Sequence, residues 1–298
     1  MVTSRPWFGV GLALLVAACF AGGSALAGLA YRHGTDPLTV STARTIAAVL
    51  VLWSLLKLRG VPIALPPTAR RNALLLGSLV AFYAWSLYQA VALMPVALAV
   101  LILYLYPLLT GLLLWALGRE RVTARGFGAL ALAFCGLLLA LDLRGQEIAW
   151  LGIVFALGGA VGFTFQLVLS SALMSRNPAQ PVTLHMLGSA AAIYVVACLA
   201  LQHFYVPHDA VGWTAFGGSV ACYIVGAIGL YSAIAILGPF KAALVLNIEP
   251  VDSMIFGYLL LGQTMSPVQL LGAACVIAAI TLGRASGRAP AAKPAAAP

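Results

Sequence analysis

The sequence has 298 residues, of which 63% are hydrophobic and only 8% are charged, and its mean hydropathy is +1.05. A soluble domain carries roughly 25% charged residues, so the composition excludes a soluble globular protein and predicts an integral membrane protein. The net charge of +9 does not indicate nucleic-acid binding, because the basic residues lie mainly between long apolar runs.

The apolar runs recur along the whole chain, and each is close to the ~20 residues that a helix needs to cross the hydrocarbon core. None of them alternates between apolar and polar residues as the strands of a membrane barrel do. The sequence therefore predicts an all-α integral membrane protein with ten transmembrane helices, over residues 7–30, 37–56, 72–93, 96–117, 125–142, 150–174, 181–202, 211–236, 240–261 and 267–284.

The basic residues also predict how the chain is oriented in the membrane. With the N-terminus in the cytoplasm, thirteen Lys and Arg residues lie on the cytoplasmic side, and Arg32 and Arg144 lie on the other. Cytoplasmic connections carry an excess of Lys and Arg, so both termini are expected in the cytoplasm. The protein is therefore expected to cross the membrane many times.

The second half of the sequence repeats the first at a constant offset of 143 residues, which places residue 150 over residue 7. The segment WFGVGLALLVAACF (7–20) matches WLGIVFALGGAVGF (150–163), and YQAVALMPVALAVLILYLYP (88–107) matches YSAIAILGPFKAALVLNIEP (231–250). Two distant blocks that share one offset and pair Trp, Tyr and Pro residues indicate an internal duplication. The duplication also predicts that the first apolar run is a membrane span and not a cleaved signal peptide.

Each repeat contains an odd number of spans, five, so the second repeat is expected to cross the membrane upside down relative to the first. Inverted repeats are typical of secondary transporters, which hold substrate near the middle of the bilayer and open to one side at a time. The sequence contains no Gly-rich ATP-binding loop, and no spacing typical of a nucleophile with its base or of a metal cluster. We therefore expect a secondary transporter rather than an enzyme, with no cofactor and no metal site.

Two segments carry a resemblance to a known family. The segment 106–140 has a Pro in the fourth span and a Gly-anchored fifth span, and EPVDSMIFGYLLLGQ (249–263) has a Glu-Pro-Val start. The chain thereby resembles the EamA-type ten-span transporters of the drug/metabolite transporter superfamily, although Gln263 stands where the family usually has Glu. The resemblance implies a first EamA-like repeat over 7–142 and a second, inverted one over 150–284. The Ala- and Pro-rich composition after Arg284 predicts a disordered cytoplasmic tail over 285–298.

The sequence is also similar to bacterial exporters of aromatic and other neutral amino acids. This similarity implies that the substrate is small, zwitterionic or aromatic, and is exported across the inner membrane. A broad drug or metabolite carrier and an uptake permease for other small organic solutes are alternatives, followed by a passive channel and a membrane-embedded enzyme. The sequence leaves open whether the protein is a monomer or a dimer.

Polar residues inside membrane spans are expected to face protein or a water-filled cavity. At 100° per residue, one face of the third span carries Ser78, Phe82, Trp85, Ser86 and Gln89. This mixture of rings and hydrogen-bonding groups suits a wall of the substrate cavity. A packing seam between helices is the alternative.

Other spans add further candidates for substrate binding. Phe20 and Phe163 are equivalent in the two repeats, Gln166 follows on the same side of the sixth span, and Tyr104 adds aromatic surface. His185 is either a binding residue or a hydrogen-bonded contact between helices. Rings together with neutral hydrogen-bonding groups favour an amphipathic or aromatic solute.

Arg44 lies inside the second span, deeper than the other basic residues. As a ligand it can hold a substrate carboxylate in a bidentate pair. As a structural residue it can bond backbone carbonyls or extend toward the membrane surface.

Glu249 and Asp252 lie well inside the ninth span, beside Pro250. Pro removes one backbone donor and clashes with the preceding turn, so we expect a bend here and at the equivalent Pro107. One hypothesis makes Glu249 a site of proton coupling. The other makes the two carboxylates a brace for the bend that shapes a gate.

Overall fold

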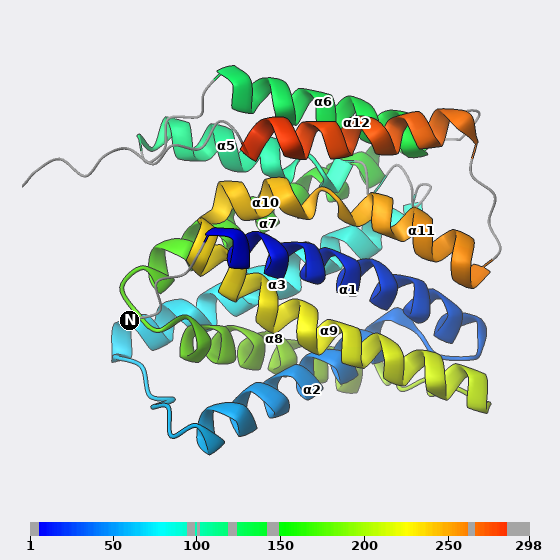
Figure 1. Cartoon of the computed structure of the whole chain (residues 1–298). Helices are drawn as coiled ribbons and strands as arrows, with labels where there is room; N and C mark the ends of the chain where they lie inside the picture. Colours follow the sequence, from blue (N-terminus) through cyan, green and yellow to red (C-terminus); the bar gives the residue numbers. More distant parts are fainter. Residues whose placement is uncertain are drawn as a thin grey trace, which may run out of the picture.

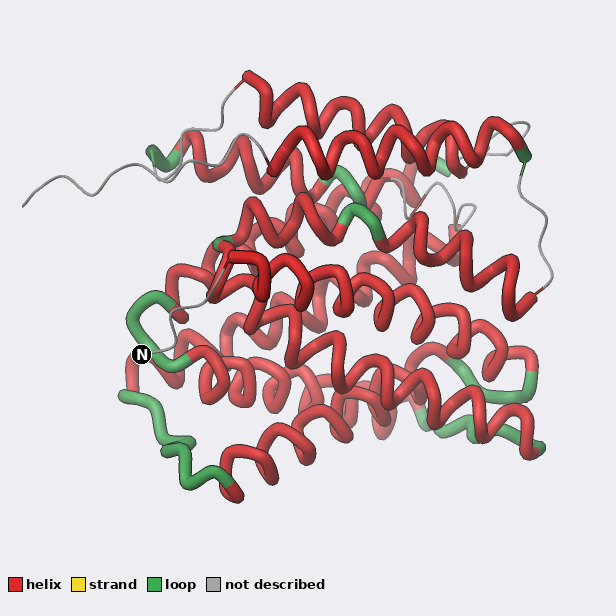
Figure 2. Tube along the Cα trace, viewed as in Figure 1, coloured by secondary structure: helices red, strands yellow, loops and turns green. Residues whose placement is uncertain are grey.

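The computed structural model consists of long helices packed side by side (Figures 1 and 2). It describes residues 6–93, 99, 102–118, 124–141, 149–261 and 266–284, so Gln263 and the tail over 285–298 lie outside the described residues. All the regular elements of the described part are helices. Their bounds are α1 Pro6–Arg32, α2 Pro37–Leu58, α3 Pro67–Leu93, α5 Tyr106–Ala116, α6 Ala124–Leu141, α7 Trp150–Met174, α8 Ala179–Leu201, α9 Ala210–Leu237, α10 Pro239–Leu246, α11 Glu249–Leu261 and α12 Pro267–Arg284.

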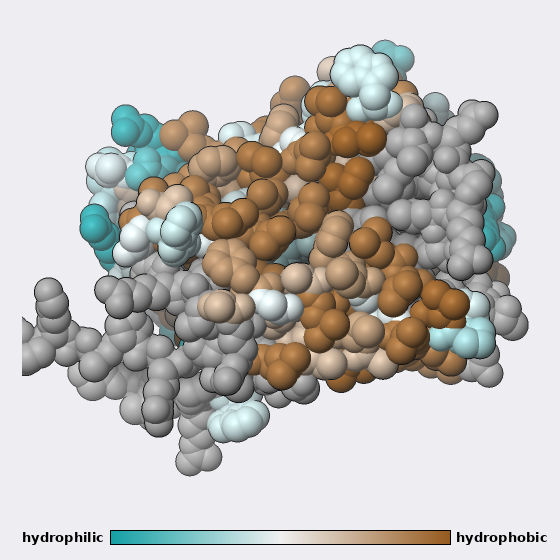
Figure 3. All heavy atoms as spheres, turned by 90° about the horizontal axis from the view of Figure 1, so that it is seen from above, coloured by the Kyte–Doolittle hydropathy of each residue, from teal (hydrophilic) through white to brown (hydrophobic). Residues whose placement is uncertain are grey.

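The helices fall where the hydropathy of the sequence predicts membrane spans. Within the described residues, α1, α2, α7, α8 and α9 are each long and apolar enough to cross a membrane without interruption. Seen from above, the surface is largely hydrophobic (Figure 3), as expected for a protein surrounded by lipid. The predicted fold class, an all-α membrane protein, is confirmed.

The two repeats pack against each other in a symmetric way. Helix α1 contacts α9, and the equivalent helices of the opposite repeats, α7 and α3, also contact each other. The contacts of α2 with α9 and of α1 with α11 are likewise matched by contacts of α8 with α3 and of α7 with α5. The pairs α2–α8 and α6–α12 contain two equivalent helices each, and Figure 1 shows α6 beside α12 at one edge of the molecule. Exchanging the repeats maps these helix pairs onto one another, so a pseudo-two-fold axis relates the two repeats.

The fourth and ninth spans are interrupted rather than bent. Residues 104 and 105 form a turn before α5, and residues 247 and 248 form a turn between α10 and α11, so the interruptions are equivalent in the two repeats. Both lie just before the prolines for which bends were expected, Pro107 and Pro250. Because Pro cannot donate to the carbonyl four residues earlier and its ring clashes with it, the preceding turn opens and a new helix begins. Pro at the start of the new helix costs nothing, because the first N–H groups of a helix have no partner within it.

Glycines allow two of the helix pairs to approach closely. A β-carbon on Gly77 of α3 would lie 2.6 Å from Cβ of Ser189 on α8, and one on Gly136 of α6 would lie 2.8 Å from Cβ of Cys275 on α12. The hydroxyl of Ser189 donates to the carbonyl of Leu74 across the first of these contacts, at 2.8 Å. Small residues at close crossings are typical of helix packing in membranes.

The connections α1–α2 and α8–α9 lie on one side of the bundle, opposite the side where α1 begins, and they bond to each other. Nδ1 of His33 lies 2.7 Å from Oδ2 of Asp209, and the hydroxyl of Thr35 donates to the carbonyl of Tyr205 at 2.6 Å. Asp209 also caps α9 by accepting from the N–H of Gly212 at 2.7 Å. The two repeats are thus joined at this end, called the opposite side below; the side where α1 begins is the N-terminal side.

Candidate functional site

The two repeats enclose a cavity of about 170 Å³ near the middle of the bundle, called the central cavity. Its walls come from α1, α2, α3, α7, α8 and α9, from residue 103 and from the first residue of α11. The lining residues are Cys19, Phe20, Gly23, Ser24, Arg44, Val80, Tyr83, Leu87, Leu103, Phe163, Leu187, Ser219, Tyr223, Ala227, Leu230, Tyr231 and Glu249. For comparison, a dry cavity of about 150 Å³ is large enough to bind benzene.

The central cavity lies on the pseudo-two-fold axis. Several residues line it together with their repeat counterparts, as Phe20 does with Phe163 and Val80 with Tyr223. The counterpart of Arg44 is Leu187, which also lines the cavity, so the walls are equivalent in position but differ in chemistry. A position on this axis is where inverted-repeat transporters hold their substrates.

Aromatic rings form two walls of the central cavity. On one wall, the guanidinium carbon of Arg44 lies 4.6 Å from the centroid of the Tyr223 ring, and the Phe20 ring lies 6.3 Å from the same ring. On the other wall, Tyr83 and Phe163 pack with ring centroids 4.7 Å apart. A cation over a ring face is stabilised by the ring quadrupole, which is one way to hold a charge inside a membrane protein.

Polar groups occupy the rest of the lining. Ser219 is buried, and its hydroxyl has no hydrogen-bond partner within the described residues. Glu249 is half-buried, and the hydroxyl of Tyr104 lies beside its carboxylate. The cavity therefore presents a guanidinium and a carboxylate together with an uncommitted hydroxyl.

The central cavity extends along α1 toward the opposite side of the bundle. Gly23 and Ser24 of α1 line it beyond the middle of the helix, toward the opposite side. Their repeat counterparts Gln166 and Leu167 lie on the N-terminal side and are fully buried. There Nε2 of Gln166 donates to the hydroxyl of Tyr231 at 2.8 Å. The path along α7 that is equivalent to the one along α1 is thus filled by buried side chains.

The α3 face for which the sequence analysis predicts substrate contact does not line the central cavity. The α3 residues that line the cavity are Val80, Tyr83 and Leu87, whereas Phe82 and Trp85 are 45% and 48% exposed. The remaining predicted residues of this face also lie outside the cavity lining: Ser78 is exposed, Ser86 is buried and Gln89 is half-buried.

The reason for the different orientation is the seam between α3 and α7. A β-carbon on Gly162 of α7 would lie 3.0 Å from the Phe82 ring, and Trp85 packs edge-on against Phe155 of α7 with centroids 5.4 Å apart. Glycines on α7 thus accept the large rings of α3, and the packing alternative describes this face. A contact of these side chains with substrate stays a prediction.

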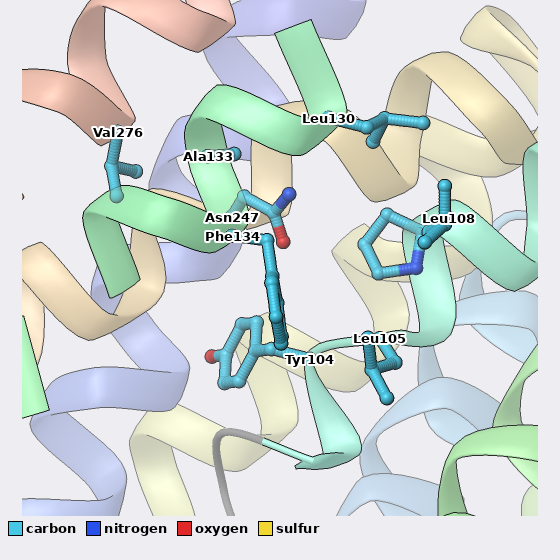
Figure 4. Close-up of a pocket in the computed structure, with 9 residues that line it drawn as sticks. Tyr104, Leu105, Leu108, Leu130, Ala133, Phe134, Asn247 and Val276 are labelled. Carbon is cyan, nitrogen blue, oxygen red and sulfur yellow. The ribbon is translucent and has the colours of Figure 1, made fainter. Parts of the chain in front are cut away.

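Three further candidates, His185, Tyr104 and Pro107, lie outside the lining of the central cavity. Nδ1 of His185 lies 2.8 Å from the carbonyl of Pro181, one turn earlier in α8. Tyr104 and Pro107 line a separate pocket of about 10 Å³, where the amide of Asn247 points in above the ring of Phe134 (Figure 4). Oδ1 of Asn247 has no partner within the described residues, and the space is about that of one water molecule.

Glu249 and Asp252 lie in the first turn of α11, after the interruption of the ninth span. The first N–H groups of a helix have no partners within it, and negative charge there is favourable. Pro250, between them, is buried. This arrangement supports the hypothesis that the carboxylates stabilise the interruption, and proton coupling stays a prediction.

Some lining residues were missed by the sequence analysis. Ser219 is a single hydroxyl in an apolar span, a signal shared with many packing residues. Tyr83 and Asn247 carried a better signal, because Tyr83 lies one helical turn from Val80, the counterpart of Tyr223, and Asn247 is the counterpart of Tyr104. Applying the repeat offset to Tyr104 would have found Asn247, whereas the counterpart of Tyr83 is Gly226, so Tyr83 needed the helical phase of Val80 as well.

Comparison with known proteins agrees with this architecture. Residues 7–141 and 150–283 each match the model of the EamA-like transporter family. An uncharacterized transporter of Archaeoglobus fulgidus is 26% identical over 253 residues, which cover 84% of this chain and 87% of the relative. The uncharacterized transporter YwfM of Bacillus subtilis is 26% identical over 61% of this chain and 62% of its own. Protein LicB of Haemophilus influenzae is 29% identical over 56% of this chain and 59% of its own. One solved crystal structure has a TM-score of 0.76 at 19% identity, covering 94% of this chain and 96% of that one, and shows the same fold.

Proposed function

Because the chain belongs to the EamA-like transporter family, we propose that it is a secondary transporter that exports aromatic and other neutral amino acids. Transport proceeds by alternating access of the central cavity across the inner membrane, with both termini in the cytoplasm. The observation that supports this substrate class best is the lining of the cavity, which combines Arg44, Glu249 and aromatic walls.

The two charges suit a zwitterion. A buried charge is stable only when it is paired and hydrogen-bonded, so a solute that brings both signs satisfies both ends of the cavity. The guanidinium of Arg44 holds the carboxylate of the amino acid in a bidentate pair, and the carboxylate of Glu249 accepts hydrogen bonds from the ammonium group. The hydroxyl of Ser219 supplies a further hydrogen bond.

The aromatic walls suit an apolar or aromatic side chain. Rings of Phe20 and Tyr223 on one wall, and of Tyr83 and Phe163 on the other, offer faces and edges to a third ring. Tilted and edge-to-face pairs are each worth about 0.5–1.5 kcal/mol beyond the area that they bury. The volume of about 170 Å³ is close to the roughly 150 Å³ of a cavity that binds benzene. It therefore suits a solute with one ring better than the larger solutes of a broad drug carrier.

Other substrate classes fit the lining less well. A phosphorylated sugar carries about two negative charges. Arg44 is the one basic residue in the described lining of the cavity, and Glu249 would repel the phosphate. An organic cation would meet the guanidinium of Arg44. A zwitterion is thus the class that both charges favour.

Proteoliposomes test the proposal. Vesicles loaded with unlabelled phenylalanine should take up external labelled phenylalanine faster than empty vesicles, because a loaded carrier returns through the membrane. A passive channel would show no such acceleration, and an enzyme would convert the label into another compound. Uptake of labelled phenylalanine that tryptophan and leucine both fail to compete would overturn the assignment to neutral amino acids as a class while leaving a transporter in place.

A further inference from the structure

The seam between α3 and α7 opens on the N-terminal side into a second hollow, called the outer groove, of about 630 Å³. It runs from Asn72 at the start of α3, along Leu75 and Leu169, to Arg176 just beyond the end of α7. It shares no lining residue with the central cavity. The outer groove is therefore a separate feature.

The repeat counterpart of the outer groove is closed. The counterparts of Leu75 and Leu169 are Gly218 on α9 and Leu26 on α1. A β-carbon on Gly218 would lie only 2.9 Å from Cδ1 of Leu26, so that seam is packed shut where the seam between α3 and α7 stands open. Side-chain packing fills the equivalent seam between α1 and α9. The outer groove therefore leaves space that a molecule from its surroundings can fill.

The surroundings of the outer groove are the bilayer. Leu75 and Leu169 are 61% and 44% exposed, and they belong to helices that cross the membrane. The walls of the groove's middle part are leucine and alanine side chains, which suit hydrocarbon and not water. An acyl chain is the occupant that the membrane itself provides.

The end of the outer groove is polar and positively charged. Asn72, Ser175 and Arg176 meet there, at the level where α3 begins and α7 ends. Arg70 and Arg71 precede Asn72 in the first turns of α3, and neither α3 nor α7 contains an acidic residue. A phosphate group placed there would meet positive charge with no acid from either helix to oppose it.

We propose that the outer groove binds one anionic phospholipid, with an acyl chain between Leu75 and Leu169 and the phosphate at Arg176 and Asn72. The predicted orientation places this end at the cytoplasmic leaflet, where anionic lipids and Lys and Arg residues attract each other. The site is independent of the substrate of the central cavity, because the two share no residue.

Native mass spectrometry of the purified full chain tests the site with phosphatidylglycerol and phosphatidylethanolamine as probes. The wild type should retain one phosphatidylglycerol in preference to phosphatidylethanolamine. Arg176→Gln should lower that preference roughly fivefold, the value expected for one cation near a membrane surface, and Arg176→Lys should restore most of it. Arg59→Gln, which removes an exposed charge at the end of α2, is the matched control and should leave the preference unchanged.

A second variant tests the apolar part of the site. Leu169→Trp fills the groove from an exposed position, so it should reduce retention of both lipids without altering the preference between them. An unchanged preference in Arg176→Gln would overturn the proposal, and so would an equal loss in Arg59→Gln, which would indicate general surface charge. Should Arg176→Gln fail to fold, Asn72→Leu removes a polar partner at the same end, and full retention of the preference there would count equally against the site.

Discussion

At the scale of single residues, charge inside this membrane protein lies where its cost is reduced. Arg44 lies over the ring of Tyr223, and Glu249 lies in the first turn of a helix with the Tyr104 hydroxyl beside it. Each of these arrangements lowers the cost of a charge at that position. Both side chains line the central cavity, where the proposed substrate binds.

The first prediction concerns which group of the substrate Arg44 and Glu249 each bind. Phenylethylamine lacks the carboxylate of phenylalanine, and phenylpropionate lacks its ammonium group. Arg44→Gln should weaken competition by phenylalanine and phenylpropionate at least about tenfold, because a hydrogen bond to a charged group is worth about 1.5–3 kcal/mol. Competition by phenylethylamine should change little. Glu249→Gln should show the reverse pattern, with phenylpropionate unaffected.

The measurement is inhibition of labelled phenylalanine uptake into proteoliposomes, with Arg59→Gln as the control. Loss of all three competitors to the same extent in both variants would contradict the assigned roles. That outcome would mean that Arg44 and Glu249 maintain the shape of the cavity rather than contact the substrate.

At the scale of the elements, hydropathy alone predicts where helices begin and end, but not which face each helix turns inward. The spans over 150–174 and 267–284 were predicted with the bounds that α7 and α12 have. The face of α3 was not, because lipid and an aromatic cavity both accept rings such as Phe82 and Trp85. The glycines of α7 decide the orientation, and their contact with α3 is visible only once the partner helix is known.

The turns that interrupt the fourth and ninth spans show a similar limit. Pro107 and Pro250 predict that the helix is disturbed, and the repeat offset predicts that the two disturbances are equivalent. The sequence does not say whether the helix bends or stops, because that depends on partners for the released backbone groups. In the structure α11 begins afresh at Glu249, with Glu249 and Asp252 in its first turn, where negative charge is favourable.

The second prediction concerns the contact between α3 and α8. Gly77→Ala places a methyl group against Ser189 and the backbone of Met186, so the helices must move apart. Overpacking of this kind costs about 1–3 kcal/mol. Gly11→Ala is the matched control, because no atom lies within 4 Å of the new β-carbon and Ala favours a helix by up to about 1 kcal/mol.

Thermal unfolding in detergent measures both variants. The melting temperature should fall for Gly77→Ala and should stay level or rise for Gly11→Ala. Equal melting temperatures for the two would show that the seam between α3 and α8 is more loosely packed than the structure indicates.

The third prediction concerns the start of α9. Hydrogen bonds from the N–H of Gly212 and from the His33 ring hold the pKa of Asp209 below its usual value. A lowered carboxylate pKa means that the folded state prefers the ionised form, so this stabilisation is present above the usual Asp pKa of about 3.9 and is lost as the pH falls through the lowered value. Asp209→Ala should therefore lower the melting temperature at pH 7, and its difference from the wild type should shrink in acid.

Thr214→Ala on the exposed surface of the same helix is the control, with a small effect that does not depend on pH. Melting curves at pH 7, 5 and 3 separate the outcomes. A difference between Asp209→Ala and the wild type that stays constant over this range would mean that the ionised carboxylate contributes nothing beyond its shape.

At the scale of the whole molecule, the pseudo-two-fold axis is the basis for the proposed alternating access. The central cavity extends toward the opposite side along Gly23 and Ser24, and the equivalent path along Gln166 and Leu167 is closed. Exchanging the conformations of the two repeats would open the second path and close the first, at a similar energy, because the sequences are related. The sequence duplication predicts two related halves with equivalent paths. Only the structure shows along which of these paths the central cavity extends.

The last prediction follows from this asymmetry. In a background in which the five native cysteines are replaced by alanine, Ser24→Cys should react with a membrane-impermeant maleimide from outside intact cells. Leu167, its repeat counterpart, is fully buried, so Leu167→Cys should resist labelling in the state described here.

The same two variants test whether the two paths open in turn. A solution condition that exposes Leu167→Cys from the cytoplasmic side must then protect Ser24→Cys. Saturating phenylalanine should change the two labelling rates in opposite directions. Independent changes in the two rates would contradict alternating access, and labelling of Ser24→Cys from the cytoplasm alone would reverse the orientation predicted from the basic residues.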